Sequence, residues 1–166
     1  MKLEIRPATA ADAARIAEVH SQGIEERVAT FRTAAREPGE VELQLADGRP
    51  AVVAEGDGAV VGWAWASPYD DAAPYYATIR EATVFVDRSA RGAGVGRLLL
   101  TALEDAATTA GAHKLVAKIF DTNRRSIRLF ESCGWRSVGT HARHGLLEDE
   151  WKDVVVLEKL LGEAAR

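Results

Sequence analysis

A chain of 166 residues with 47% hydrophobic and 28% charged residues suits one domain that buries its core without disulfides. Its net charge of −4 argues against a general nucleic-acid-binding surface, and a single cysteine, Cys133, excludes both a disulfide framework and a cysteine-rich zinc site. Because the N-terminal stretch lacks the features of a secretory signal and no apolar run approaches the roughly 20 residues that span a bilayer, we expect a cytoplasmic protein with no membrane partner.

The hydrophobic periodicity and the turn residues predict a mixed α/β chain rather than a regular βαβ repeat. In chain order we expect a strand at 2–7, a helix from Thr9 to about Val28, a short helix from Pro38, strands at 50–55, 59–67 and 76–86, a helix at 94–110, a strand at 115–120, a helix capped by 121–123 that runs through Cys133, and strands at 135–142 and 152–160. The strongest signals are the Asp57-Gly58 turn between two apolar runs, which favours a hairpin, and the helical spacing of the apolar residues in 94–110.

The four histidines do not form a recognisable metal site. His20 lies on the apolar side of the first expected helix, and we interpret it as a core histidine whose hydrogen bonds are satisfied. His113, His141 and His144 have neither the spacing of metal ligands nor an acidic cluster beside them. We therefore expect no metal.

A glycine-rich turn joins the strand that ends at Val86 to the helix at 94–110. Gly92, Gly94 and Gly96 let the backbone approach a ligand closely, and the free N–H groups at a helix start suit a phosphate. The turn does not match the dinucleotide fingerprint G-x-G-x-x-G, and no Gly-Lys pair is present for a nucleoside triphosphate loop. The glycines alone leave two interpretations open, a phosphate cradle and a structural turn.

Longer motifs resemble one acetyltransferase family. The motif Arg91-x-x-Gly94-x-Gly96, at the start of an amphipathic helix, resembles the acetyl-CoA motif Q/R-x-x-G-x-G/A of the GNAT acetyltransferases. EIRPATAADAARI, IEERVATFRT, EATVFV and NRRSIRLFESCGW follow in an order similar to the branch that acetylates phosphinothricin, methionine sulfoximine and arsinothricin. The resemblance covers nearly the whole chain. It implies one GNAT domain over 1–166, of the α/β (α+β) class, with a mixed, mostly antiparallel sheet of about seven strands flanked by about four helices.

The resemblance also implies an activity. It implies an enzyme that moves an acetyl group from acetyl-CoA to the primary amine of a small amino-acid-like acceptor, by direct attack and without an acyl-enzyme. Acetyl-CoA is the implied cosubstrate, the implied assembly is a homodimer, and the implied role is resistance to antibiotic or herbicide compounds. Two alternatives stay open: an acetyltransferase for peptide or protein N-termini, and an acyl-CoA-binding sensor without catalysis.

By the resemblance, the cosubstrate is held by backbone groups of two segments and by two side chains. The N–H groups of the turn 91–96 bind the pyrophosphate, the strand residues pair with the pantetheine arm, and the N–H of Val84 is the oxyanion donor. The implied binding residues are Val84, Phe85, Val86, Arg91, Gly92, Ala93, Gly94, Val95, Gly96, Asn123 and Ser126.

Glu81 is the candidate catalytic base. In an extended strand it shares a face with Thr83 and Phe85, partly apolar surroundings that suit a carboxylate to accept a proton, and the catalytic glutamate of the family falls at this position. The residues alone leave open a surface glutamate paired with an arginine. The general acid has no assignment, because Phe130 stands where many family members have a tyrosine and the phosphinothricin enzymes often have a histidine; water, Tyr75 and Tyr76 are the alternatives.

An acceptor with anionic ends requires cationic side chains. Arg80, Arg32 and Arg143 are the candidates, although the loop before the catalytic strand also carries the acidic Asp70 and Asp71. The resemblance implies that Phe31 and Tyr75 form pocket walls. It also implies that the segment ARHGLLEDEWKDVVVLEKL is a hairpin that closes the acceptor site and contributes to a dimer, with a plain terminal hairpin as the alternative.

Overall fold

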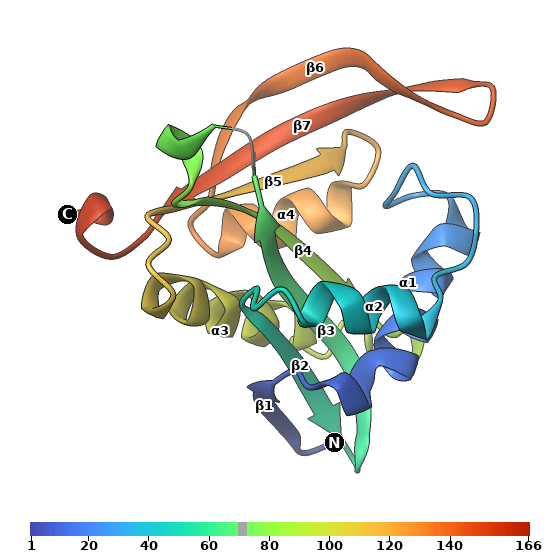
Figure 1. Ribbon diagram of the computed structural model, residues 1–166. Helices are drawn as coiled ribbons and strands as arrows, with labels where there is room; N and C mark the ends of the chain where they lie inside the picture. The colour runs from blue at the N-terminus through green and yellow to red at the C-terminus, as the bar shows by residue number, and fades with distance from the viewer. Residues whose placement is uncertain (70–72) are drawn as a thin grey trace.

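The computed structural model describes residues 1–69 and 73–166, and these residues form a seven-stranded sheet with helices on both faces (Figure 1). In chain order the elements are β1 (Leu3–Pro7), α1 (Ala13–Glu26), α2 (Pro38–Leu45), β2 (Ala51–Gly56), β3 (Ala59–Pro68), β4 (Ile79–Val86), α3 (Val95–Thr109), β5 (Lys114–Phe120), α4 (Arg124–Ser132), β6 (Arg136–Leu147) and β7 (Glu150–Leu160). The sheet with its four helices confirms the expected fold class.

The sheet diverges between its fourth and fifth strands. The strand order is β1-β2-β3-β4-β5-β7-β6, and every neighbouring pair is antiparallel except β4 and β5. The parallel contact of β4 with β5 has three residue pairs and ends at Glu81↔Val116, whereas β4 stays paired with β3 as far as Val86. From Ala82 onward, the backbone groups on the β5 side of β4 are therefore not paired with β5.

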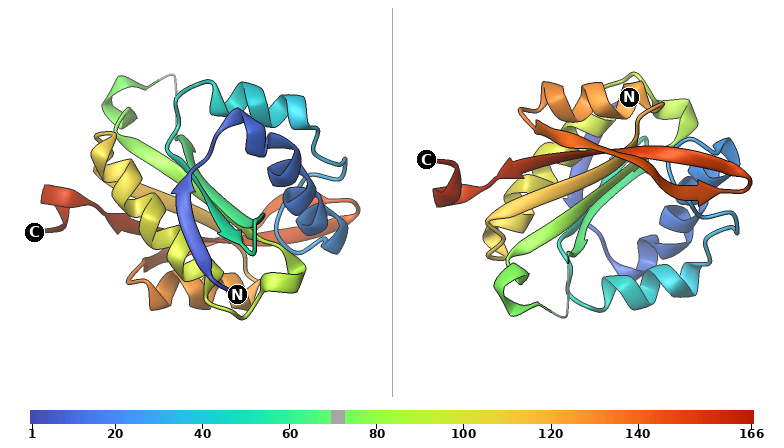
Figure 2. Two further views of the ribbon diagram at one scale, coloured as in Figure 1. Left: turned by 90° about the horizontal axis from the view of Figure 1, so that it is seen from below. Right: turned by 90° about the horizontal axis from the view of Figure 1, so that it is seen from above.

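Each face of the sheet is covered by one pair of helices (Figure 2). Helices α3 and α4 pack on one face, where Leu99 and Leu103 are completely buried. Helices α1 and α2 cover the other face, where Ile16 packs with Trp63 and Trp65 of β3. Burying one such aliphatic side chain contributes roughly 1.5–3 kcal/mol, so both helix layers are held on the sheet mainly by apolar burial.

The C-terminal hairpin is longer than the sequence pattern indicates. The expected strands 135–142 and 152–160 extend to β6 and β7, which leave only Glu148 and Asp149 as the connection. The β6–β7 register shifts twice along the hairpin, and Arg143 has a φ of 47°. These irregularities break the two-residue alternation, and nearly all of β6 is exposed, so the sequence lacks the usual strand signal there.

Two other element boundaries also differ from those expected from the sequence. The strand expected at 76–86 begins at Ile79, because Pro74–Tyr76 form a single 3-10 turn. Helix α1 ends at Glu26 rather than near Val28, because Arg27 takes a left-handed conformation with a φ of 56°. The second change matters for the site, because it turns the chain toward the cavity described next.

Candidate active site

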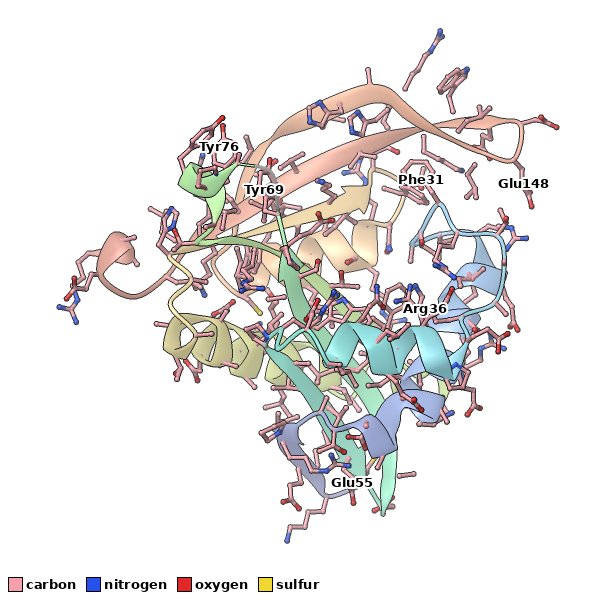
Figure 3. All side chains as sticks on the ribbon, in the orientation of Figure 1. Phe31, Arg36, Glu55, Tyr69, Tyr76 and Glu148 are labelled. Carbon is pink, nitrogen blue, oxygen red and sulfur yellow. The ribbon has the colours of Figure 1, made fainter. Side chains whose placement is uncertain are left out.

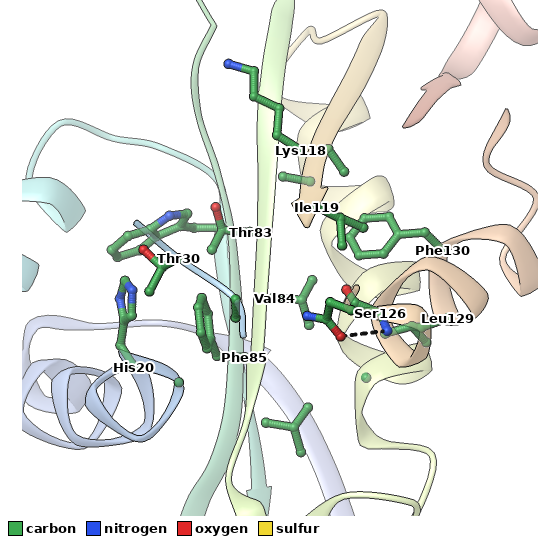
Figure 4. Close-up of a pocket in the computed structure, with 18 of the residues that line it drawn as sticks. His20, Thr30, Thr83, Val84, Phe85, Lys118, Ile119, Ser126, Leu129 and Phe130 are labelled. Carbon is green, nitrogen blue, oxygen red and sulfur yellow. Dashed lines mark hydrogen bonds between the residues drawn. The ribbon is translucent and has the colours of Figure 1, made fainter. Parts of the chain in front are cut away.

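A cavity of about 940 Å³ occupies the divergence between β4 and β5. The glycine turn before α3 and the start of α4 line one end of it, and α1, α2 and the segment between them line the other. Figure 4 shows the side chains of Thr83 and Phe85 on the α1 side of β4, and Val84 on the opposite side with Ser126 and Leu129. The cavity therefore reaches both faces of the sheet.

The backbone of β4 presents hydrogen-bonding groups to this cavity. Asp87 donates its N–H to the carbonyl of Val61 in β3 at 2.9 Å. Because the bonding direction alternates along an antiparallel strand, Val84 and Val86 direct their N–H and C=O groups away from β3. Strand β5 no longer pairs with β4 at this height, and both valines line the cavity. The edge can accept another extended chain, or direct the Val84 N–H at a reacting oxygen.

The glycine turn forms an open cradle of N–H groups. Gly92 and Gly94 have φ angles of 84° and 81°, which favour glycine, and Gly94 is the N-cap of α3. The first N–H to bond back into the helix is that of Leu98, to the carbonyl of Gly94 at 3.2 Å, so the preceding N–H groups of the first turn remain available. A Cβ at Gly94 would meet no atom within 4 Å. This arrangement suits a phosphate group.

The Arg91 side chain attaches the turn to α1. Its guanidinium donates to the Glu26 carboxylate at 2.9 Å and to the Val86 carbonyl at 3.1 Å. The backbone of the turn, rather than this engaged guanidinium, therefore offers the free donors.

The buried carboxylate of Asp87 forms a second link from the strand end to α1. It accepts hydrogen bonds from Arg15 at 2.6 Å, from Gln22 at 2.8 Å and from the N–H of Ser89 at 2.9 Å. Burial opposes ionisation, but the hydrogen bonds from Ser89, Gln22 and Arg15 outweigh it and hold the pKa of Asp87 well below its ordinary value. This network fixes where the turn begins.

The opposite wall of the cavity begins with α4. Asn123 is the N-cap, and its Oδ1 accepts a hydrogen bond from the N–H of Ser126 at 3.3 Å (dashed line in Figure 4). Asn123 and Ser126 both line the cavity, as does Phe130. The structure thus brings the residues of α4 that the sequence singled out together with the glycine turn.

Glu81 lies where β4 and β5 separate, on the cavity wall. Its side chain is 30% exposed and accepts a hydrogen bond from Lys118 of β5 at 3.2 Å. The partner is a lysine from the neighbouring strand rather than an arginine, and the surroundings are less apolar than the strand pattern indicates. A half-buried carboxylate beside free backbone donors can take part in proton transfer.

Among the residues expected at the acceptor, only Phe31 lines the cavity. Its ring meets Phe120 edge to face, with 4.7 Å between the ring centroids. Tyr75, Arg80 and Arg143 are not part of the cavity wall. The Tyr75 side chain is exposed to solvent, and its ring contacts the ring of Tyr76 edge to face. Asp70 and Asp71 lie outside the described residues.

The third arginine candidate, Arg32, is engaged elsewhere. Its guanidinium donates to the Glu40 carboxylate at 3.0 Å, and Arg32 is not part of the cavity wall.

Four basic residues of the cavity wall were missed by sequence reasoning: Arg36, Arg49, Lys118 and Arg125. Lys118 could have been found from the two-residue period of its strand, once β5 is placed beside β4. Arg36 precedes α2 in a segment without regular structure, so no sequence pattern indicates its position.

His20 does not have the satisfied hydrogen bonds expected of it. The ring packs against Phe85, with 4.4 Å between centroids, and against Trp63, but its Nδ1 has no hydrogen-bond partner among the described residues. Burial, followed by the positive charges of Arg36 and Arg32, lowers the pKa of His20 to about 4. The ring is therefore neutral at physiological pH.

Residues 1–69 and 73–166 contain no helix that is both long and apolar enough to cross a membrane. Nor do His, Cys, Asp and Glu side chains there gather in a group of three or more that could hold a metal ion.

Comparison with known proteins shows a family whose sequence pattern this chain matches. The model of the acetyltransferase (GNAT) family matches residues 21–135. A phosphinothricin N-acetyltransferase of Streptomyces viridochromogenes is 37% identical over 155 residues, which cover 92% of this chain and 84% of that protein. An L-methionine sulfoximine/L-methionine sulfone acetyltransferase of Salmonella typhimurium is 29% identical and covers 98% of this chain and 97% of its own.

A solved structure shares both the sequence likeness and the fold. The GNAT superfamily phosphinothricin acetyltransferase of Sinorhizobium meliloti, in complex with AcCoA, has a TM-score of 0.90 and 30% identity, and the match covers 98% of this chain and 90% of that one. With the family match across more than half of its length, the chain belongs to the acetyltransferase (GNAT) family.

Proposed function

We propose that the protein transfers the acetyl group of acetyl-CoA to the primary amine of a small amino-acid-like acceptor, of the phosphinothricin, methionine sulfoximine or arsinothricin type. The observation that carries the proposal is one continuous cavity at the β4–β5 divergence. It joins free N–H groups of the α3 start, the unpaired edge of β4 and the carboxylate of Glu81. The activities named for the Streptomyces and Salmonella relatives support this class of acceptor.

The residues present fit acetyl-CoA. The open cradle at Gly92 and Gly94 suits the pyrophosphate, and a side chain at Gly94 would project into free space that a ligand can use. The outward N–H and C=O groups of Val84 and the outward N–H of Val86 suit the amides of the pantetheine arm, which would lie like an added strand, whereas the Val86 carbonyl already accepts a hydrogen bond from Arg91. When bound, acetyl-CoA supplies an activated thioester. Asn123 and Ser126 stand on the other wall.

The protein's own groups then have distinct tasks. Glu81 accepts a proton from the acceptor ammonium or amine, directly or through water, so that nitrogen attacks the carbonyl carbon without an acyl-enzyme. The N–H of Val84 stabilises the negative charge that develops on the carbonyl oxygen. Phe130 holds no transferable proton, and Tyr75 and Tyr76 are not part of the cavity wall, so water delivers the proton to the departing sulfur.

The acceptor end supports a small acceptor over an extended peptide. The β6–β7 hairpin closes on the segment after α1: a Cβ at Gly145 would lie 2.5 Å from the Phe31 ring, and Glu148 accepts a hydrogen bond from Arg27 at 3.0 Å. These contacts leave little room above the acceptor end for a peptide chain.

The test is a screen of acceptors that measures CoA release. Purified protein with acetyl-CoA is presented with phosphinothricin, methionine sulfoximine, free amino acids and short peptides. Release that requires a small amino-acid-like amine, with the acetylated product identified by mass spectrometry, is the expected result. Peptides as the preferred acceptors would overturn the acceptor class, and tight acetyl-CoA binding without turnover of any amine would favour a sensor.

We also propose a cytoplasmic homodimer with a role in resistance to such compounds. The hairpin exposes the large apolar side chains of Val138, Leu146 and Trp151, which suit burial against a second copy. Light scattering coupled to size-exclusion chromatography tests this assembly, and a monomer at micromolar concentration contradicts it.

A further inference from the structure

Unpaired buried polar atoms gather at one end of the molecule. Within the described residues, six buried side-chain nitrogen or oxygen atoms lack a hydrogen-bond partner, and they belong to His20, Arg32, Arg36, Gln44 and Trp63. All of these residues come from α1, the segment after it, α2 and β3. Each such atom costs roughly 1–3 kcal/mol, and folded proteins retain few of them. Three of the residues, His20, Arg36 and Gln44, line the cavity, where a ligand can complete missing bonds.

Arg36 is the more deeply buried of the two arginines in this group. Its side chain, labelled in Figure 3, is only 6% exposed, and its Nε and Nη2 are both buried and have no hydrogen-bond partner among the described residues. The nearest carboxylate oxygen, Oε2 of Glu40, is 3.6 Å from Nε, and the same carboxylate already accepts a hydrogen bond from Arg32. A buried cation is normally paired and hydrogen-bonded, so Arg36, whose ion pair with Glu40 is long and shared with Arg32, lacks an anion of its own.

The neighbouring charges do not supply that anion. Arg49 also lies over the Trp65 ring, but Asp47 binds it at 2.6 Å. Three arginines thus share two carboxylates, those of Asp47 and Glu40. Burial, and then the charge of Arg32, lower the pKa of Arg36 from its ordinary value, and the opposing attraction of the Glu40 carboxylate does not compensate for them.

Arg36 faces the surface that carries the candidate base. Its guanidinium lies 5.6 Å from the centre of the Trp65 ring. On the β3–β4 ladder Trp65 is opposite Thr83, and the next pair on the same face is Ser67 with Glu81, so Trp65 and Glu81 are diagonal neighbours, about 7–8 Å apart. Arg36 and Glu81 line the same cavity. A small molecule in this cavity can therefore contact Arg36 at one end and Glu81 at the other.

We propose that Arg36, with the amide of Gln44 and the face of Trp65, forms a subsite that binds an anionic group of the amine acceptor, a carboxylate or a phosphinate, and thereby determines acceptor specificity. The inference rests on the proposed function. The planar guanidinium can hold two oxygens of such a group at once. The free Oε1 of Gln44 accepts a hydrogen bond from a water that bridges to the anionic group or from an N–H of the acceptor, and Trp65 forms a flat wall beside it.

The test compares Arg36→Gln and Arg36→Lys with the wild type on matched acceptors. L-Glutamate against L-glutamine removes a distal charge, and L-methionine against its methyl ester removes the α-carboxylate. For at least one pair, Arg36→Gln should raise KM for the charged member roughly 10- to 100-fold, with little effect on kcat or on the neutral member. Arg36→Lys, which keeps the charge but not the fork, should recover part of the loss. The pair that responds identifies which anionic group Arg36 binds.

The matched control is Arg49→Gln, which removes a second buried arginine from the same Trp65 ring. It should leave the ratio of KM values within each acceptor pair unchanged. Arg36→Met, which removes a buried charge that has only a long, shared ion pair, should fold with a Tm at or above that of the wild type. Equal effects of Arg36→Gln on charged and neutral acceptors, or an equal change of ratio in Arg49→Gln, would overturn the subsite.

A binding measurement separates this inference from the proposed function. Without acetyl-CoA, millimolar phosphinothricin or sodium glutamate should raise the Tm of the wild type but not of Arg36→Gln. If no acceptor releases CoA, the proposed function fails, and the Tm shift still decides the subsite. An equal Tm shift in both proteins, or none in either, contradicts the subsite even if turnover is observed.

Discussion

The ammonium group of Lys118 on β5 donates a hydrogen bond to the carboxylate of Glu81 on β4 at 3.2 Å, at the point where these two strands stop pairing. Both side chains are partly exposed, at 42% and 30%. Ion pairs of this kind contribute about 1 kcal/mol or less to stability. The fold therefore does not depend on the Glu81 carboxylate, and a loss of activity on its replacement reports on chemistry.

Glu81→Gln should lower kcat by roughly 10²- to 10⁴-fold, the usual contribution of a general base. Its Tm and its affinity for acetyl-CoA should stay close to the wild-type values, because the amide keeps the shape of the side chain and the cradle lies elsewhere. Turnover, calorimetric titration with acetyl-CoA and thermal melting check the three expectations. Lys118→Gln is the control: if it lowers kcat as much, the ion pair rather than the carboxylate is required. Wild-type rates for Glu81→Gln across pH contradict its role as the base.

The elements with strong local signals were predictable from the sequence, and the arrangements that depend on distant segments were not. The Asp57-Gly58 turn and the periodicity of 94–110 place the β2–β3 hairpin and α3 within one or two residues. The extent of β6 was missed because its bulges and exposure remove the alternation that marks a strand. The local pattern carries no information on such pairing.

The residues of the candidate site also separate into those that the sequence predicts and those that it does not. The glycine turn and Glu81 were found because each lies in a short motif. Arg36 and Lys118 were not, because their positions follow from the packing of the segment before α2 and from the parallel pairing of β5. Arg36 reaches the cavity only because its segment packs against Trp65 of β3, which is distant in the sequence.

Gly94→Ala should weaken acetyl-CoA binding about tenfold or more, because the new methyl group enters the cradle. Gly58→Ala on the β2–β3 turn is a close control: the two glycines have φ angles of 81° and 82°, and a Cβ at either meets nothing within 4 Å. Both variants pay the same backbone strain, roughly 1–2 kcal/mol. Calorimetric titration with acetyl-CoA should therefore separate them, whereas melting curves should not. Equal acetyl-CoA affinities in the two variants would exclude the turn as the phosphate site.

Gly145→Ala tests the contact between the hairpin and the acceptor end. Its Cβ would lie 2.5 Å from the ring of Phe31, so the ring or the hairpin must move. We expect KM for the acceptor to change severalfold while the affinity for acetyl-CoA stays constant. Gly139→Ala on the same strand has no atom within 4 Å of its Cβ and should match the wild type in both. If steady-state kinetics give the two variants the same KM, Phe31 does not shape the acceptor end.

The neutral, buried His20 should make the protein less stable in acid. In the unfolded chain this histidine takes up a proton as the pH falls through about 6.5, whereas burial, and then the charges of Arg36 and Arg32, lower its pKa in the folded protein to about 4. The unfolded state therefore binds more protons between these values, and the free energy of unfolding falls by roughly 2–3 kcal/mol from about pH 7 to about pH 4.5. His20→Gln cannot take up that proton, so its free energy of unfolding should fall less over the same interval.

The measurement is urea denaturation of wild type and His20→Gln at both pH values. Carboxylates whose folded-state pKa is lowered, Asp12 by its hydrogen bond with Arg6 and Glu158 by its hydrogen bond with Arg136, also lose stabilisation as the pH falls. They do so equally in both proteins, so the difference between the two pH dependences isolates the histidine. Parallel curves would mean that the ring of His20 is protonated in the folded protein as easily as in the unfolded chain.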